Sequence, residues 1–272
     1  MDGRLAQIIA LVAHGNLLLR DSAAGGNEPQ IGLAAHSTFK YVSSITFTRD
    51  DDSDRYPAGG AVAGSLADWF AFLRANGVSR LWYIGLGHRG GKTQEYVAPA
   101  WSESVPYAIQ TDWPDRFELW YPLWETGGPS EKPWHVEYRG MLSGHSHALP
   151  KRDASAAKAQ MKAGISSAAD FARRPEVQAD SWGTVLDEAV ALLDDPHPQP
   201  PYHADMLPET GYNLAARQIL AAAVKANIFG GMGSWNDMGF GDPALQREYE
   251  QVSAELYAAL RLGFVVAANA FE

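Results

Sequence analysis

Apolar side chains recur every three to four residues in six stretches of the chain, which is the period of an amphipathic helix. This period predicts helices over 5–14, 65–77, 153–173, 182–193, 210–229 and from 243 through 260. Three sites carry helix-starting signals: Ser65 with Asp68 three residues later, Thr210, and Asp242 before a proline. Their side-chain oxygens can accept hydrogen bonds from the first free backbone amides of a helix.

Elsewhere apolar and polar residues alternate, which is the period of a half-buried strand. The alternation predicts strands over 17–20, 39–48, 80–86, 94–98, 104–110, 116–123 and 134–139. From residue 80 on the connections are short, so consecutive strands should pair antiparallel as a meander. The order predicts an α+β fold: an antiparallel β-meander with flanking helices in residues 1–150, and a helical part over 151–272. The two parts form either two domains or one fused core.

The strand over 116–123 divides its side chains between two faces by parity. Phe117, Leu119, Tyr121 and Leu123 share one face. Glu118, Trp120 and Trp124 share the other, which we expect to be the outer face of the sheet. That face is either an aromatic binding surface or is covered by helices, and the rarity of exposed tryptophan clusters favours covering.

The composition excludes several classes of function. The net charge is −10 and both halves of the chain are acidic, so the positive surface of a nucleic-acid-binding protein is missing. The chain has no cysteine, which excludes disulfides, thiolate metal sites and cysteine nucleophiles. No apolar stretch of the sequence approaches the length needed to span a bilayer, so we expect a cytoplasmic protein without a membrane partner.

Two loops resemble ligand motifs but fail their requirements. Residues 85–93 end in Gly-Lys-Thr, yet Leu86 stands where a phosphate-binding loop needs its first glycine, and a strand pattern follows instead of a helix. Asp50, Asp52 and Asp54 have the spacing of a calcium loop, but Arg55 replaces its essential glycine. We interpret the first loop as a glycine-rich hairpin and the second as a solvated turn.

Two histidine-containing pairs have the spacing of metal ligands on a strand, His135 with Glu137 and His145 with His147. Imidazole and carboxylate together bind Zn, Mn or Fe and activate a bound water. Alternatively, the first pair is the polar face of a strand and the second lies in a loop. A further group, which we rank below these pairs, lies in a proline-rich connector: Asp194, Asp195, His197, His203 and Asp205.

The stretch 229–240 is rich in both glycine and large apolar residues, so we expect a sharp turn whose side chains pack inward. Gly230 should take a left-handed conformation at the end of the preceding helix. Ser234 and Asp237 have the spacing of a capping box. The candidate hinge or pocket residues are Gly230, Gly231, Ser234, Trp235, Asn236 and Asp237.

No complete catalytic motif emerges, so the sequence favours a non-catalytic cytoplasmic binding protein that engages a basic protein partner, as an inhibitor or immunity protein does. The expected contacts are an acidic loop and an aromatic face: Asp50, Asp52, Asp54, Glu118, Trp120 and Trp124. The alternative is a metal-dependent hydrolase that uses His135, Glu137, His145 and His147.

Overall fold

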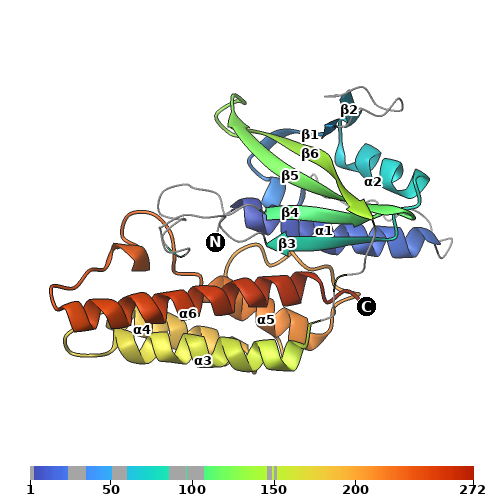
Figure 1. Ribbon diagram of the computed structural model, residues 1–272. Helices are drawn as coiled ribbons and strands as arrows, with labels where there is room; N and C mark the ends of the chain where they lie inside the picture. Colours follow the sequence, from blue (N-terminus) through green and yellow to red (C-terminus); the bar gives the residue numbers. More distant parts are fainter. Residues whose placement is uncertain are drawn as a thin grey trace.

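The computed structural model describes residues 3–23, 35–50, 60–85, 96, 107–145, 149 and 152–272. This part of the chain forms a mixed β-sheet and six α-helices, which confirms the α+β class (Figure 1). The helices are α1 Gly3–Ala23, α2 Leu66–Ala75, α3 Ala154–Ala172, α4 Asp180–Leu192, α5 Leu214–Lys225 and α6 Pro243–Ala268. The strands are β1 Val42–Asp50, β2 Gly60–Ala63, β3 Arg80–Gly85, β4 Tyr107–Asp112, β5 Arg116–Thr126 and β6 Trp134–His145.

The sheet has the order β2-β1-β6-β5-β4-β3. Strands β3 to β6 pair antiparallel in sequence order, so the predicted meander is confirmed. Strand β1 joins the meander by pairing parallel with β6, which makes the sheet mixed. The strand predicted over 94–98 lies outside the described residues, apart from Tyr96.

Helix α1 is longer than the sequence predicts. It continues through Gly15 to Ala23, so the strand predicted over 17–20 is wrong. Gly15 does not end the helix but lets it approach the sheet: a Cβ atom there would lie 2.4 Å from Leu81 Cδ1 and 2.7 Å from Phe70 Cε1. A glycine inside a helix can therefore report close packing rather than a terminus.

The predicted helix starts are confirmed at two of three sites. The Ser65 hydroxyl accepts a hydrogen bond from the Asp68 amide at 3.1 Å, and Asp242 accepts one from the Ala244 amide at 2.7 Å. Helix α5 instead begins after Asn213, whose side chain accepts from the Ala216 amide at 3.0 Å. Both Thr210 and residues 226–229, predicted as helical, lie outside the helix.

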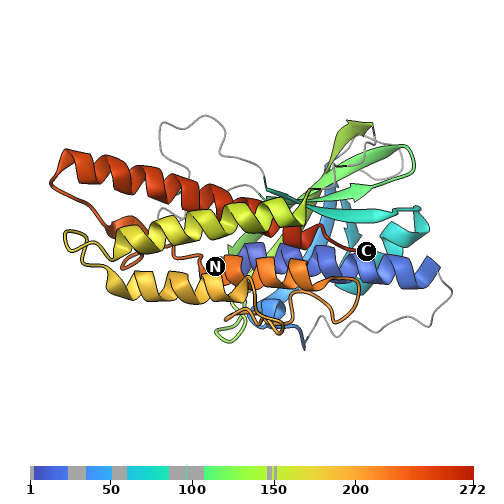
Figure 2. The same cartoon turned by 90° about the horizontal axis from the view of Figure 1, so that it is seen from below.

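Helices α3 to α6 form a bundle beside strand β3 (Figures 1 and 2). Among the described helices, α6 is long and apolar enough to cross a membrane, which the sequence reading did not anticipate. However, 61% of its apolar window is buried inside the protein. Packing against α3 and α5 accounts for its apolar character. Buried side chains of the sheet and the bundle belong to one hydrophobic cluster, and the division near residue 150 stays a prediction.

Helices α1 and α2 cover one face of the sheet, which we call the inner face. Its centre is a group of aromatic rings in which Phe47 stacks on Trp69 with centroids 4.3 Å apart and Trp120 meets Trp69 edge-on at 5.6 Å. Trp120 is fully buried. The predicted division by parity is correct, and helices cover the face of Glu118 and Trp120, which is the alternative that the sequence favoured. That face is therefore the inner face and not the outer one, and Leu119, Tyr121 and Leu123 lie on the outer face.

Glu118 is a buried acid on this inner face. Its carboxylate forms ion pairs with buried Arg49 and with Arg116, whose Nε lies 2.9 Å from Glu118 Oε1. Two guanidinium groups compensate the carboxylate that folding removes from water. The charge alternation along β5 is therefore the signature of an internal ion-pair network.

The glycine-rich stretch forms a turn held by internal hydrogen bonds. Gly233 takes the left-handed conformation at φ 82°, and Gly230 does not, so that prediction is wrong. Trp235 is fully buried as predicted, and its Nε1 donates to Ser253 Oγ at 2.8 Å. Asp237 accepts from the Gly233 amide rather than completing a capping box with Ser234.

Candidate functional site

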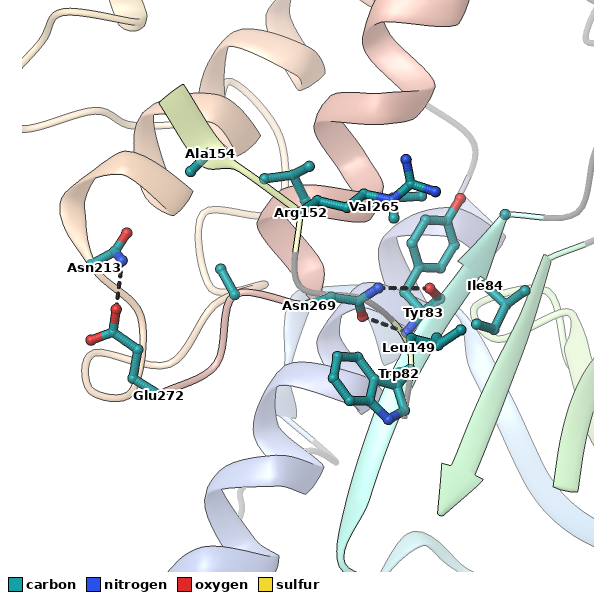
Figure 3. A pocket seen from close by; sticks show the side chains of 13 residues that line it. Trp82, Tyr83, Ile84, Leu149, Arg152, Ala154, Asn213, Val265, Asn269 and Glu272 are labelled. Atoms are coloured by element: carbon teal, nitrogen blue, oxygen red, sulfur yellow. Dashed lines mark hydrogen bonds between the residues drawn. The ribbon is translucent and has the colours of Figure 1, made fainter. Parts of the chain in front are cut away.

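The free edge of strand β3 is closed by two asparagine side chains. Asn16 on α1 donates to Leu81 O at 2.9 Å and accepts from Leu81 N at 2.8 Å. Asn269 after α6 does the same for Tyr83, at 2.9 and 2.7 Å (Figure 3). Each carboxamide takes the place of a neighbouring strand's peptide group, which satisfies an edge that would otherwise invite pairing with another chain.

Beyond Asn269 this edge borders a pocket of about 300 Å³, which we call the β3-edge pocket. It lies where the end of β3, the end of α6 and the starts of α3 and α5 meet. Its apolar walls include Trp82, Leu149 and Val265. Gly85 also lines it, and the period of the strand aims the Gly85 peptide groups at the same edge as those of Leu81 and Tyr83.

The polar side chains of the β3-edge pocket differ in how they are used. Asn269 is committed to Tyr83, and Asn213 donates to Glu272 Oε1 at 2.7 Å. Figure 3 shows the Glu272 carboxylate turned toward Asn213, while the Arg152 side chain extends in the opposite direction, across α6. Arg152 has no hydrogen-bond or ion-pair partner among the described residues. The pocket therefore combines apolar walls with the guanidinium of an exposed arginine that has no partner in the described part of the chain.

A second polar site joins residues that are distant in sequence: His14, His36, Ser37, His203 and Asp205, which we call the histidine cluster. The Asp205 carbonyl lies 2.9 Å from His14 Nε2 and 2.7 Å from His36 Nε2. Its carboxylate accepts from the Ser37 amide at 2.8 Å and from the Ser37 hydroxyl. Ser37 Oγ also lies 2.8 Å from His203 Nδ1.

Two of the five candidate ligands in the proline-rich connector are therefore held in fixed positions by the fold. His203 and Asp205 converge on Ser37, whereas Asp194 pairs with Lys158 and Lys162 on α3. Burial lowers the pKa of His14 and of His203. Sequence analysis missed His14, His36 and Ser37, because only the folded chain brings the first helix beside the connector.

Of the four residues proposed as metal ligands, the three that the structure describes do not come together. His135 and Glu137 share a strand face, but His145 stands at the far end of β6, ten residues from His135 and roughly 30 Å away at about 3.3 Å per residue. His147 lies outside the described residues. No group of three or more His, Asp or Glu suited to a metal occurs in the described part of the chain.

His135 and Glu137 are instead bound to neighbouring side chains. Ser44 Oγ lies 2.7 Å from His135 Nδ1. The hydrogen bond from Thr48 is the main cause that holds the pKa of Glu137 below its ordinary value, assisted by Arg139 at 3.2 Å. The pair is therefore part of a polar ladder between β1 and β6.

The residues proposed for partner contacts do not form one exposed surface in the described part of the chain. Glu118 and Trp120 are buried on the inner face and are unavailable to a partner. Trp124 is half-buried, with its ring 5.7 Å from that of Trp134. Asp50 ends β1 beside Met141, and Asp52 and Asp54 lie outside the described residues.

The candidate hinge or pocket residues mostly bind one another. Asn236 accepts from the Gly230 amide at 3.2 Å and donates to Tyr96 O at 2.7 Å. The β3-edge pocket is not lined by Gly230, Gly231, Ser234, Trp235, Asn236 or Asp237, and neither is a groove of about 430 Å³ between α4 and the end of α5. Their contacts are those of residues that stabilise the fold.

No protein-family model, curated protein or solved structure matches this chain.

Proposed function

We propose that this chain is a ligand-binding protein that holds a small carboxylate in the β3-edge pocket. The observation that carries the proposal is the uncommitted Arg152 guanidinium at an otherwise largely apolar cavity. A guanidinium presents a planar fork of donors that matches the two oxygens of a carboxylate. Although the chain has net charge −10 and Glu272 also lines the pocket, Arg152 has no acidic partner among the described residues.

The walls of the pocket suggest the rest of the ligand. Trp82, Leu149 and Val265 favour an apolar or aromatic body, because its burial removes apolar surface from water. The volume of about 300 Å³ is at the small end of ligand sites, which fits a compact aromatic acid. The Gly85 peptide and the fixed Asn269 side chain supply an ordered polar rim.

The test compares ligands that differ only in charge. Thermal unfolding is followed with phenylacetate and with phenylacetamide, and then with further acid and amide pairs of different body size. The acid should stabilise the wild-type protein more than its amide, because only the acid pairs with Arg152. Arg152→Gln should weaken acid binding roughly 10- to 100-fold, since hydrogen bonds to charged groups contribute about 1.5–3 kcal/mol.

Arg247→Gln is the matched control, because Arg247 is an exposed arginine on the first turns of α6, at the other end of the helix from the pocket. It should leave acid binding unchanged. Equal responses to acid and amide would overturn the proposal, as would a response that survives Arg152→Gln. The absence of a response to any acid in the panel would also contradict it.

A second proposal, a basic protein partner, is favoured by the outer face of the sheet. There Leu119 lies opposite Met141, Tyr121 opposite Arg139, and Leu123 opposite Glu137. Met141 is 47% exposed and Leu123 39% exposed. Asp50, where the acidic loop begins, ends β1 beside Met141. Apolar anchors on the strand next to Asp50, at which an acidic run of the sequence begins, suit a partner with a positively charged rim.

The partner is sought by pull-down from the native host at low and high salt. Binding should weaken as salt rises, because screening shortens electrostatic attraction, and the double change Leu123→Glu with Met141→Glu should abolish it. The control is Met232→Glu, at a fully exposed methionine outside the sheet. Self-association of the chain through this face, or capture that resists the double change, would contradict this proposal while leaving the carboxylate proposal intact.

A further inference from the structure

His203 occupies an unusual place in the histidine cluster. Its backbone takes the left-handed conformation at φ 52°, which few residues other than glycine adopt. Its side chain lines a groove of about 430 Å³ between α4 and the end of α5, which we call the His203 groove. This groove shares no lining residue with the β3-edge pocket.

The hydrogen bonds of the cluster fix where the protons lie. Burial acts to raise the pKa of the Asp205 carboxyl, but the two hydrogen bonds from Ser37 outweigh it and the pKa is lowered. Asp205 is therefore an acceptor only, and the Ser37 hydroxyl must donate to it. The Ser37 oxygen is then left to accept the second hydrogen bond, from Nδ1–H of His203 at 2.8 Å.

The same logic separates His203 from its neighbours. His14 and His36 both place Nε2 against the Asp205 carbonyl, which can only accept, so both carry their proton on Nε2. His203 carries it on Nδ1. Burial lowers the pKa of His203, which favours the neutral form of its ring. Its Nε2 then has a lone pair, and this atom has no hydrogen-bond partner among the described residues.

We propose that the His203 groove binds a phenolic molecule whose hydroxyl donates a hydrogen bond to Nε2 of His203. The two ring nitrogens of an imidazole point in widely different directions, so with Nδ1 held by Ser37 the Nε2 lone pair faces away from the cluster. Aromatic side chains line the same groove, among them Trp182, Tyr202 and Phe229. They offer ring surfaces for an aromatic ligand, and Ser37 and Asp205 act as positioning residues.

The first test measures the tautomer directly. Long-range proton–nitrogen NMR of the imidazole rings at pH 7.5 should show His203 protonated on Nδ1, and His14 and His36 on Nε2. Ser37→Ala should move His203 toward the Nε2–H form, and Ser37→Thr, which keeps a hydroxyl, should restore Nδ1–H. A wild-type His203 protonated on Nε2, or on both nitrogens, would overturn the proposal.

The second test measures binding. 4-Ethylphenol should shift the His203 resonances, and 4-ethylanisole, which lacks the donor hydrogen, should bind at least about threefold more weakly. His203→Ala should remove that difference, whereas His197→Ala, at an exposed histidine of the same connector, should preserve it. N-acetyltyrosinamide shows whether the phenol is a free molecule or a tyrosine side chain. Equal binding of phenol and anisole would contradict the proposal.

Discussion

The two faces of the sheet carry similar residues but opposite roles. On the inner face, Trp120 is packed among aromatic rings and Glu118 is enclosed by two arginines. On the outer face, Tyr121 and Leu123 belong to the same strand and remain partly in contact with solvent. Aromatic and charged residues occur on both faces, but the tryptophans gather on the face of Trp120, and it was this clustering that favoured covering by helices.

The largest expected effect on the inner face comes from Trp120→Ala. Removing a fully buried tryptophan should lower the free energy of unfolding by about 3–5 kcal/mol, because a cavity replaces the lost contacts. Leu123→Ala on the outer face should cost less than about 1 kcal/mol. Urea denaturation of both variants checks the contrast, and equal losses would show that the two faces are not distinct.

Breaking the ion pair on the inner face should lower the free energy of unfolding by nearly as much. Arg49→Met leaves Glu118 buried with Arg116 as its main remaining partner, and should lower stability by about 3 kcal/mol. Adding Glu118→Leu should recover much of that loss, since no buried charge then remains to be compensated. A double-mutant cycle measured by chemical denaturation tests this, and a double variant less stable than Arg49→Met would contradict it.

The close contact between α1 and the inner face gives an intermediate effect. Gly15→Val should lower stability by about 1–3 kcal/mol, because the new side chain overlaps Leu81 and Phe70. Gly3→Ala, where an added Cβ meets no atom within 4 Å, is the control and should be tolerated. Unaltered thermal stability of Gly15→Val would show that α1 lies farther from the sheet.

The smallest effect belongs to Glu137 on the outer face. Its pKa is depressed in the folded protein, so it contributes stability above its ordinary pKa of 4.5, and this contribution is lost as pH falls through the folded value. Because 31% of the side chain is exposed, solvent screening should keep the contribution below about 1 kcal/mol. The stability difference between the wild type and Glu137→Gln should shrink below pH 4; a constant difference would argue against it.

The sequence predicts a structural feature correctly where that feature depends on residues close together in the chain. The Ser65 box, the Asp242 cap and the alternation along β5 each depend on neighbouring residues, and each was predicted correctly in kind. The orientation of β5 depends on Phe47 and Trp69, which lie elsewhere in the chain. No period within β5 contains that information.

The candidate functional sites are even harder to predict from the sequence, because they combine residues that are distant in the chain. Arg152 precedes α3 and Asn269 follows α6, and Ser37 meets His203 across more than half of the chain. A usable signal did exist for Asn16, a polar residue in an apolar run. Such a residue is expected to find a buried partner, and Leu81 on the strand edge is that partner.

The central claim, that Arg152 binds a carboxylate in the β3-edge pocket, is tested most directly at the guanidinium itself. The Nε–H signal of Arg152 is assigned in proton–nitrogen NMR spectra by its loss in Arg152→Gln, and phenylacetate is then titrated. We expect this signal to shift and saturate with phenylacetate but not with phenylacetamide, while the Arg247 signal stays in place. An Arg152 signal that ignores the acid, or that moves equally with the amide, would contradict it.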